Sequence, residues 1–396
     1  MQPTDLPSPG SGATQHGQRD HNSRLILTLI QRQGALPGKD IAHLAGLSPQ
    51  TVSVILRDLE NDGFILRGPP RRGHVGKPSV PMALAPGAVH SLGLKIGRRS
   101  ADLVLCDFLG TVIGQLRTTY RWPLPGDILA FLRDGIDHLT RDLSALQKAR
   151  IAGIGIARPH EIWSWHDALG APAGTLGIWR GFDLAAGIAG FSPLPVFIEN
   201  DATAACRAEH LYGRGRAFRD FAYFFVGAFI GGGIVLNHSV MEGATGNAGA
   251  FGSLPARRAD GTPCQLIDAA SIWLLEAALT RAGHDPAVLW THPQDWSGFG
   301  PLLESWLDQT AQAIAAAAVT VCAVADFGAI IIDGGFPPAV RTRLTDLVRT
   351  RLTTLDRRGL SPFDVHAGAV GSNARAIGAA CTPIFARHLL NTHSPA

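Results

Sequence analysis

Residues 49–59, a short segment near the N-terminus, carry apolar and polar side chains at spacings that would place them on opposite faces of a helix. The apolar ones, at the spacing of one helix face, are Val52, Ile55, Leu56 and Leu59. The polar side chains on the other face are Gln50, Thr51, Ser53 and Arg57, and Ser48 directly precedes the segment. Hydroxyl, amide and guanidinium groups of this kind hydrogen-bond to base edges in the major groove. Ser48 is also a good N-cap, because its hydroxyl can accept from a first-turn amide. The pattern predicts a DNA-reading helix.

A basic loop follows this segment, after a predicted strand at residues 63–66. The chain has no acidic residue between positions 63 and 101, and the loop at 67–78 is rich in Gly and Pro. Its cations are Arg67, Arg71, Arg72 and Lys77. A basic loop of this kind contacts DNA phosphates or enters a narrow minor groove. A protein-interaction module is the alternative interpretation, but the order of the signals favours DNA binding.

Two further helices must position the reading helix. Apolar spacing predicts one at residues 22–30 and a short one at 39–44, with a tight turn at 45–47. Together with the strand and the loop, they predict a winged helix-turn-helix domain over residues 21–85. Residues 1–20 are rich in Pro, Ser, Gly and Gln and have no apolar run, so they predict a disordered tail and not a signal peptide.

Composition limits the remaining possibilities. A chain of 396 residues suggests two or three domains, and a net charge of +3 makes any basic surface local. The five cysteines are odd in number, widely spaced and form no Cys-x-x-Cys, which argues for the cytoplasm and against a disulfide framework. The longest apolar stretch, residues 313–325, is too short to span a membrane and predicts a buried helix.

Beyond residue 88 strands and helices alternate, which predicts an α/β body of two lobes. The predicted strands are 89–96, 101–108, a third after 107, then 151–157, 195–199, 221–226, 232–236 and 329–332. The predicted helices are 127–148, 202–211, 263–282, 298–325 and 338–355. We place the body at residues 88–396, with the lobe boundary near 205 and a C-terminal helix that returns to the first lobe.

Several short motifs together resemble the ROK family (repressors, uncharacterised proteins and sugar kinases), specifically its repressor branch. They are Leu47-Ser48-Pro49-Gln50-Thr51-Val52-Ser53, Gly76-Lys77-Pro78, Glu199-Asn200-Asp201-Ala202, Gly231-Gly232-Gly233-Ile234 and Gly246-Asn247-Ala248-Gly249. The resemblance covers roughly residues 22–390. It implies a two-lobed, actin-like sugar-kinase fold, of the ASKHA type, with a cleft between the lobes.

The phosphate loops depart from the family's kinase pattern. Where the kinases resemble Asp-x-Gly-Gly-Thr, this chain has Lys95-Ile96-Gly97-Arg98-Arg99. Where they resemble Gly-Thr-Gly, it has Gly227-Ala228-Phe229. Phosphoryl transfer requires close backbone approach to the phosphates together with a metal site and a base. Two altered loops therefore predict a chain that is not an enzyme and uses no nucleotide cofactor.

The family's sugar and zinc residues are only partly kept. Asp201 matches its general base and Asn200 a sugar contact, although both types also cap helices. The family's Gly-Glu-x-Gly-His has become Gly249-Ala250-Phe251-Gly252-Ser253, and Cys264 alone remains of the zinc loop, so we predict no metal site. The candidate ligand contacts that the resemblance implies are Asn200, Asp201, Asn247, Ser253 and Asp268.

Three hypotheses follow. The first is a transcriptional regulator, a repressor, that binds a double-stranded operator as a homodimer or homotetramer and responds to a sugar or sugar derivative. The second is an ATP-dependent sugar kinase with an accessory DNA-binding module. The third is a ligand-independent DNA-binding protein whose body serves only for dimerisation. The altered phosphate loops favour the first and third over the second, while Asn200 and Asp201 favour a retained ligand site.

Overall fold

The computed structural model describes residues 15–70, 79–165, 171–172, 174–258, 260–291 and 293–390. The chain forms two compact units. Of the described residues, the smaller unit holds 15–88 and 385–390, and the larger one runs from Val89 to Ile384. The sequence predicted that residues 88–396 form the body. The structure differs from this prediction at residues 385–390, which belong to the N-terminal unit.

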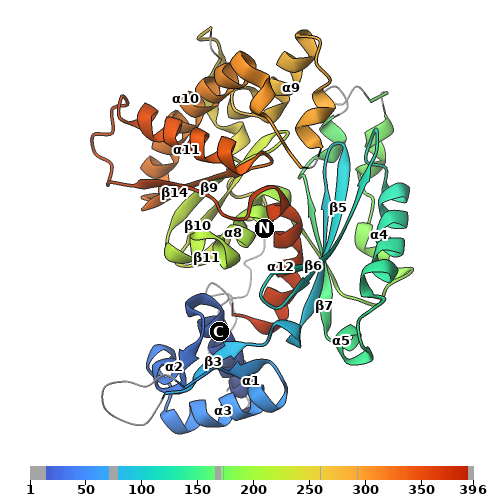
Figure 1. Ribbon diagram of the computed structural model, residues 1–396, viewed down its shortest axis with the longest axis vertical. Helices are drawn as coiled ribbons and strands as arrows, with labels where there is room; N and C mark the ends of the chain where they lie inside the picture. The colour runs from blue at the N-terminus through green and yellow to red at the C-terminus, as the bar shows by residue number, and fades with distance from the viewer. Residues whose placement is uncertain are drawn as a thin grey trace, which may run out of the picture. The chain divides into compact units, whose positions relative to one another are not determined.

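Helices and a small sheet build the N-terminal unit (Figure 1). The helices are α1 (Gln15–Gln33), α2 (Gly38–Ala45) and α3 (Pro49–Asn61). The strands are β1 (Leu36–Pro37), β2 (Ile65–Arg67) and β3 (Pro81–Leu84), antiparallel in the order β1-β3-β2. Apolar side chains from every helix and from β2 are buried inside the unit, among them Ile26, Ile41, Ile55 and Ile65. This is a winged helix-turn-helix, as predicted.

Helix α1 begins earlier than its apolar pattern indicated. Residues 15–20 are helical, whereas the sequence predicted a tail there; residues 1–14 lie outside the described part of the chain. Arg19 in this added turn forms an ion pair with Asp58 of α3. A partner that is distant in sequence supports this polar turn, and a local apolar pattern does not reveal such a partner.

Residues 386–390 pack on α1 within the same unit. Arg24 donates to the backbone oxygens of Leu389, at 3.1 Å, and Ala386, at 3.0 Å. The backbone N–H of Leu390 donates to the hydroxyl of Thr28 at 2.9 Å. These bonds satisfy carbonyls at the C-terminal end of a helix that otherwise have no partner inside it.

The first lobe of the body is a five-stranded sheet in the order β6-β5-β4-β7-β8. Its strands are β4 (His90–Ile96), β5 (Ser100–Asp107), β6 (Val112–Thr119), β7 (Ile151–Arg158) and β8 (Val196–Asn200). Helices α4 (Pro125–Thr140) and α7 (Leu184–Ala189) belong to this lobe, and α4 covers one face of the sheet (Figure 1). The predicted helix 127–148 is wrong in its second half. Ser144 and Gln147 form a capping box that starts a separate helix, α5 (Ala145–Ala149).

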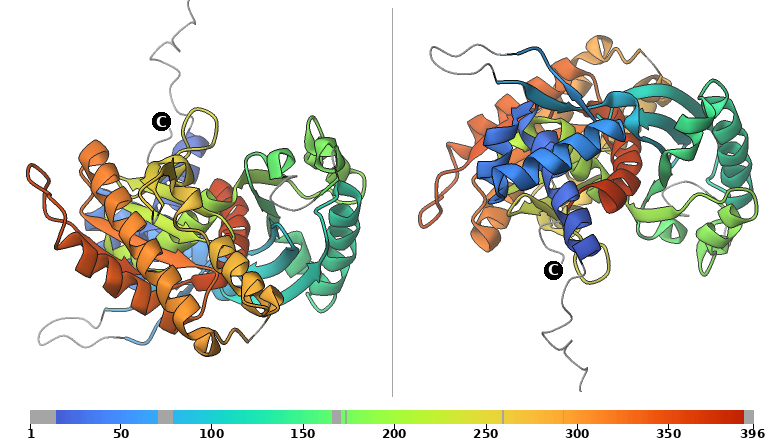
Figure 2. Two further views of the ribbon diagram at one scale, coloured as in Figure 1. Left: turned by 90° about the horizontal axis from the view of Figure 1, so that it is seen from above. Right: turned by 90° about the horizontal axis from the view of Figure 1, so that it is seen from below.

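The second lobe holds another five-stranded sheet, in the order β11-β10-β9-β14-β15. Its strands are β9 (Phe221–Val226), β10 (Ile230–Leu236), β11 (Ser239–Met241), β14 (Ala329–Gly334) and β15 (Asp364–Ala367). Helices α9 (Ile272–Arg281), α10 (Gly300–Ala325) and α11 (Pro338–Leu352) pack here, and α10 and α11 lie side by side in both views of Figure 2. The predicted helix at 263–282 starts too early, because Pro263–Gln265 pairs as strand β13 with β12 (Pro255–Arg257).

Helices α8 (Asp201–Tyr212) and α12 (Ala374–His388) lie between the two sheets of the body (Figures 1 and 2). Glycine permits their close packing. A Cβ on Gly155 of β7 would lie 1.7 Å from the carbonyl oxygen of Ala379, and one on Gly378 would lie 1.8 Å from that of Ala204. Side chains at these glycines would force α12 away from the first sheet and from α8.

One helical stretch in the described part of the chain, Ser297–Ala325, is long and apolar enough to cross a membrane. It contains α10, whose inward residues, such as Leu303, Leu307, Ile314 and Ala318, are buried in the core of the second lobe. Since those side chains already have protein neighbours, the stretch is explained as a core helix, as the sequence predicted for residues 313–325.

Candidate DNA-binding surface and ligand cavity

The predicted reading face of α3 is exposed. Gln50, Ser53 and Arg57 project from the helix, while Val52, Ile55, Leu56 and Leu59 are buried beneath it. The turn before α3 is sharp because Gly46 adopts φ 65°, which costs glycine little. Ser48 caps the helix. Its hydroxyl accepts from the Thr51 backbone N–H at 3.1 Å and lies 2.9 Å from the Thr51 hydroxyl. Ser48 and Thr51 therefore fix the start of the helix, which leaves Gln50, Ser53 and Arg57 as exposed polar groups of the predicted reading face.

Sequence reasoning missed Val54. This valine lies on α3 between Ser53 and the buried Ile55, and 48% of its surface is exposed. An apolar side chain on a reading face makes contact with the thymine methyl group. Helical spacing alone could have revealed it, because Val54 falls outside the buried stripe of Val52, Ile55 and Leu59.

The wing is partly defined. Arg67 lies on β2, where its guanidinium forms a bidentate pair with Glu60 of α3, with N–O distances of 2.6 and 2.7 Å. A phosphate contact from Arg67 must therefore compete with this pair. The other predicted wing cations, Arg71, Arg72 and Lys77, lie outside the described residues.

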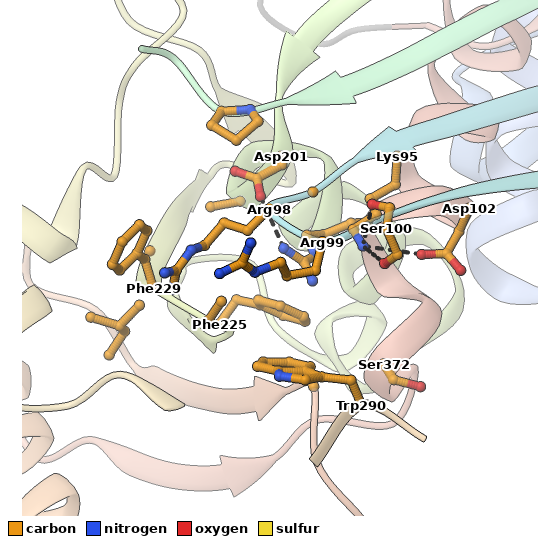
Figure 3. Close-up of a pocket in the computed structure, with 18 of the residues that line it drawn as sticks. Lys95, Arg98, Arg99, Ser100, Asp102, Asp201, Phe225, Phe229, Trp290 and Ser372 are labelled. Atoms are coloured by element: carbon orange, nitrogen blue, oxygen red, sulfur yellow. Dashed lines mark hydrogen bonds and ion pairs between the residues drawn. The ribbon is translucent and has the colours of Figure 1, made fainter. Parts of the chain in front are cut away.

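The body contains a cavity of about 1140 Å³ between its two sheets. The turn between β4 and β5, the start of α8, the loop after β9 and the start of α12 all line it (Figure 3). Asn200, Asp201, Asn247 and Ser253 are among the lining residues, so four of the five candidate ligand contacts come together here. Asp268 is not in this lining; its side chain lies 3.9 Å from Arg258 instead.

Lys95 holds the altered first phosphate loop in place through hydrogen bonds. The Lys95 ammonium donates to Asp102 at 3.0 Å, to the Ser100 hydroxyl at 3.1 Å and to the Ser100 carbonyl at 3.3 Å. All three N–H groups of the ammonium thus have acceptors. A Cβ on Gly97 would lie only 2.6 Å from the Lys95 Nζ, so the lysine also fills the inside of the turn.

The charges around this turn affect one another. Burial lowers the pKa of Lys95 to about 8, and Arg375 and Arg117 act in the same direction while Asp102 opposes them. Burial would raise the pKa of Asp102, but the three cations outweigh it and the pKa falls below its ordinary value. The Lys95–Asp102 pair is therefore held inside a cluster of positive charge.

The second altered loop uses its backbone internally. The carbonyl of Gly227 accepts from the Ile272 N–H at 3.0 Å, and the carbonyl of Ala228 accepts from the Trp273 N–H at 3.2 Å. These are first-turn amides of α9, which in a phosphate site would be the natural donors to an anion. The centre of the Phe229 ring lies 4.4 Å from the Arg98 guanidinium carbon.

The start of α8 combines a cap and an ion pair. Asn200 caps the helix, because its side-chain oxygen accepts from the Ala202 N–H at 2.9 Å and from the Thr203 N–H at 3.4 Å. The Asp201 carboxylate instead faces α12 and lies 3.1 Å from an Arg375 nitrogen. The sequence left open whether these two residues cap the helix or face the ligand site. In the structure Asn200 caps the helix, and Asp201 faces the cavity as one half of an ion pair.

The described part of the chain contains no group of three or more His, Cys, Asp or Glu side chains that could hold a metal ion. Cys264, the single remnant of the family's zinc loop, lies on strand β13. One thiolate cannot provide the four ligands of a structural zinc site.

Comparison with known proteins agrees with both parts of this architecture. A family model described as ROK family matches residues 91–265, and one described as winged helix-turn-helix DNA-binding matches residues 19–65. The chain therefore carries a ROK family domain behind a winged helix-turn-helix domain, which confirms the resemblance and the fold class inferred from its motifs.

Relatives include proteins of known and unknown role. The uncharacterized protein y4fQ of Sinorhizobium fredii is 23% identical over 92% of this chain and 91% of its own length. The xylose repressor of Bacillus subtilis is 24% identical over 59% of this chain, and the match spans 60% of the repressor.

Solved structures show the same fold. A ROK family transcriptional regulator, described as a homologue of the Escherichia coli MLC protein, aligns with 93% of this chain and 96% of its own at a TM-score of 0.64 and 20% identity. A ROK family glucokinase from Streptomyces griseus aligns with 74% of this chain and 98% of its own, with a TM-score of 0.58 and 19% identity. The fold is thus shared by regulators and by kinases, and the site must distinguish them.

Proposed function

We propose that this protein is a cytoplasmic transcriptional repressor that binds a double-stranded DNA operator and holds a small molecule in the body cavity without phosphorylating it. The observation that carries the DNA-binding half is the exposed face of α3. Gln50, Ser53 and Arg57 project from a helix whose start is fixed by Ser48 and whose opposite face is buried. Relatives named as repressors support the same role.

The absence of catalysis rests on three features of the cavity. Lys95 fills the turn where the family's kinases carry a carboxylate loop. The first-turn N–H groups of α9 donate to the carbonyls of Gly227 and Ala228 and are therefore engaged within the protein. The carboxylate that matches the family's base, Asp201, is paired with Arg375. A general base must be within reach of the proton it removes, and a cation bound to it competes with that role.

A repressor of this type works as a symmetric oligomer, which we propose is a homodimer. Two copies of α3 would then enter successive major grooves of a palindromic operator. A ligand in the cavity changes DNA affinity only if it binds one conformation of the protein better than the other.

Two assays of the purified full-length protein test this proposal. The first is capture of genomic DNA fragments followed by a gel-shift screen of sugars and sugar derivatives on the captured site. The expected result is a specific site that one class of small molecule releases. The second is a coupled assay of ATP consumption with the same sugars, for which we expect no turnover. Turnover that depends on one sugar would establish the kinase hypothesis, and a specific site that ignores every ligand would favour a body that serves only for dimerisation.

A further inference from the structure

A buried arginine on α8 binds one carboxylate from each lobe of the body. Arg207 is only 4% exposed, and its helix lies between the two sheets (Figure 1). Its Nε and one terminal nitrogen donate to the same oxygen of Glu199, at 3.3 and 3.2 Å. That terminal nitrogen also donates to Glu242, at 2.9 Å. Glu199 lies on β8 of the first lobe, and Glu242 directly follows β11 of the second, so the guanidinium joins the two lobes.

These two carboxylates adjoin the residues that line the cavity from either side. Glu199 directly precedes Asn200, which is one of the candidate ligand contacts in the lining. Glu242 begins the loop 242–249, which carries another such contact, Asn247. The position of each contact therefore depends on a residue that Arg207 binds.

Helix α12 is attached to the same carboxylate. The other oxygen of Glu199 accepts from the hydroxyl of Thr382 on α12. Arg375, earlier on this helix, lines the cavity and pairs with Asp201. With both of its oxygens engaged, Glu199 connects the strand before the ligand contacts to Arg207 and to α12.

The loop 242–249 is compact and held at both ends. The N–H of Ala248 donates to the carbonyl of Glu242 at 3.0 Å, which brings the two ends of the loop together. A Cβ on Gly249 would lie only 2.7 Å from the Cα of Gly233, so this end of the loop packs closely against β10. At the other end, the side chain of Glu242 attaches the loop to Arg207.

The two halves of this arrangement differ in exposure. The side chains of Arg207 and Glu199 are 5% and 11% exposed, whereas that of Glu242 is 59% exposed, and residues 243–246 of the loop are exposed as well. Loss of the Glu242 contact leaves Arg207 paired with Glu199, so it does not leave a buried charge without a partner. The contact that can open at the least cost is therefore the one that holds the loop.

We propose that Arg207 is a positioning residue of the ligand cavity, which holds the loop 242–249 through Glu242 so that Asn247 lines the same cavity as Asn200. The proposal rests on the function proposed above and adds to it the contact that sets the shape of the ligand site. The buried pair with Glu199 is the fixed part of this arrangement. The exposed pair with Glu242 is the part that opens when the loop moves.

The test uses variants of Glu242, because a substitution of Arg207 would leave Glu199 buried without its cation and would destabilise the fold. Full-length wild type, Glu242→Ala and Glu242→Asp would be compared by hydrogen exchange of their backbone amides, without ligand or DNA. Glu304→Ala is the matched control, since the side chain of Glu304 is 57% exposed and also pairs with an arginine.

We expect the amides of residues 243–248 to exchange at least about fivefold faster in Glu242→Ala than in the wild type, because exchange reports the local opening of the loop. Glu242→Asp keeps the carboxylate and should recover part of the protection. In Glu304→Ala these amides should exchange at the wild-type rate. In every variant β9 and β14 should also keep wild-type exchange, and urea unfolding should show no greater loss of stability in Glu242→Ala than in Glu304→Ala.

Two results would overturn the proposal. One is equal exchange of residues 243–248 in Glu242→Ala and the wild type. The other is faster exchange throughout the body in Glu242→Ala, since the contact would then stabilise the whole fold and not position the loop. These measurements need neither an operator nor an effector, so a failure of the positioning proposal and a failure of the repressor proposal are observed in separate experiments.

Discussion

The Asp201 carboxylate and the Arg375 guanidinium lie 3.1 Å apart, with the first residue of α8 facing the second residue of α12. Both side chains are largely buried, with 19% and 15% of their surface exposed. The pair joins two helices that lie between the two sheets of the body, and it engages the carboxylate at the position of the family's base. It is the feature on which the proposed absence of catalysis most depends.

Removal of Asp201 should change the ligand response and leave DNA binding intact. In Asp201→Ala, Arg375 loses its ion-pair partner, which should cost roughly 1–3 kcal/mol of unfolding free energy and add net positive charge to the cavity. We therefore expect the concentration of effector that releases half of the operator to differ between Asp201→Ala and the wild type, with operator affinity in the absence of effector unchanged. Equal effector concentrations for the two folded proteins would mean that the carboxylate does not contribute to the ligand site.

Truncation of the reading helix should reduce specific binding. Gln50→Ala and Arg57→Ala each remove an exposed group of α3 that can bond to a base edge, which is worth about 1–3 kcal/mol, or roughly 5- to 150-fold in affinity for the operator. Fluorescence anisotropy on the captured site and on scrambled DNA measures the specificity ratio. If both variants keep the wild-type ratio, α3 is not the element that reads the sequence.

We expect Val54 to contact the methyl group of a thymine in the operator. The methyl group of thymine is worth about 0.8 kcal/mol in an apolar contact, or about fourfold in affinity. Replacement of operator thymines by uracil, one at a time, should weaken wild-type binding by this amount at one position of each half-site. In Val54→Ala the same replacement should have a smaller effect, because the apolar partner is gone. Uniform sensitivity in both proteins would exclude Val54 from direct reading.

Release of Arg67 should strengthen nonspecific binding. Glu60→Gln removes the bidentate carboxylate partner and frees the guanidinium for a DNA phosphate. The affinity for random DNA should rise, and the slope of log affinity against log salt should steepen by about one. Glu304→Gln is the control, since it removes the carboxylate whose two oxygens accept from Arg343 in the body. Identical salt slopes for Glu60→Gln and Glu304→Gln would show that Arg67 does not reach the DNA.

Acid should destabilise the N-terminal unit through His388. Burial lowers the pKa of this histidine to about 4, with Arg387 and Arg24 acting in the same direction. The folded state thus holds a neutral ring, whereas the unfolded chain binds a proton below about 6.5. The contribution of His388 is complete above pH 6.5 and is lost as the pH falls toward 4.

Urea unfolding at pH 7 and pH 5 measures this effect. The free energy of unfolding should fall less in His388→Gln than in the wild type. Some dependence should remain, because burial also lowers the pKa of His90 and His366 in the body. An equal fall in the two proteins would remove His388 as a source of acid sensitivity.

Local pattern was enough to predict the helix-turn-helix and most strands of the body. Alternation of apolar and polar side chains defines α3, and the Ser48 cap and Gly46 turn are coded within a few residues. The exceptions also have local causes that were overlooked, such as the Ser144–Gln147 capping box that divides the predicted helix 127–148.

The cavity could be predicted only in part, because its chemistry joins residues distant in sequence. Motif resemblance grouped Asn200, Asp201, Asn247 and Ser253, and all four line the same cavity. It could not indicate that Arg375, 174 positions away, pairs with Asp201. Likewise the substitution of lysine at position 95 reads as a lost carboxylate, while its ammonium in fact fastens the turn through Asp102 and Ser100. The first pairing depends on how α8 and α12 pack together, and the second depends on the register of the neighbouring strands β4 and β5.

The most direct test of the central claim is the base sequence that full-length protein selects from genomic DNA. The account predicts enrichment of a shared palindromic site whose half-sites lie about one helical turn, or a multiple of it, apart, and loss of that enrichment in Arg57→Ala. Fragments without a shared motif, or the same motif with wild type and Arg57→Ala at equal strength, would contradict the assignment of α3 as the reading helix of a repressor.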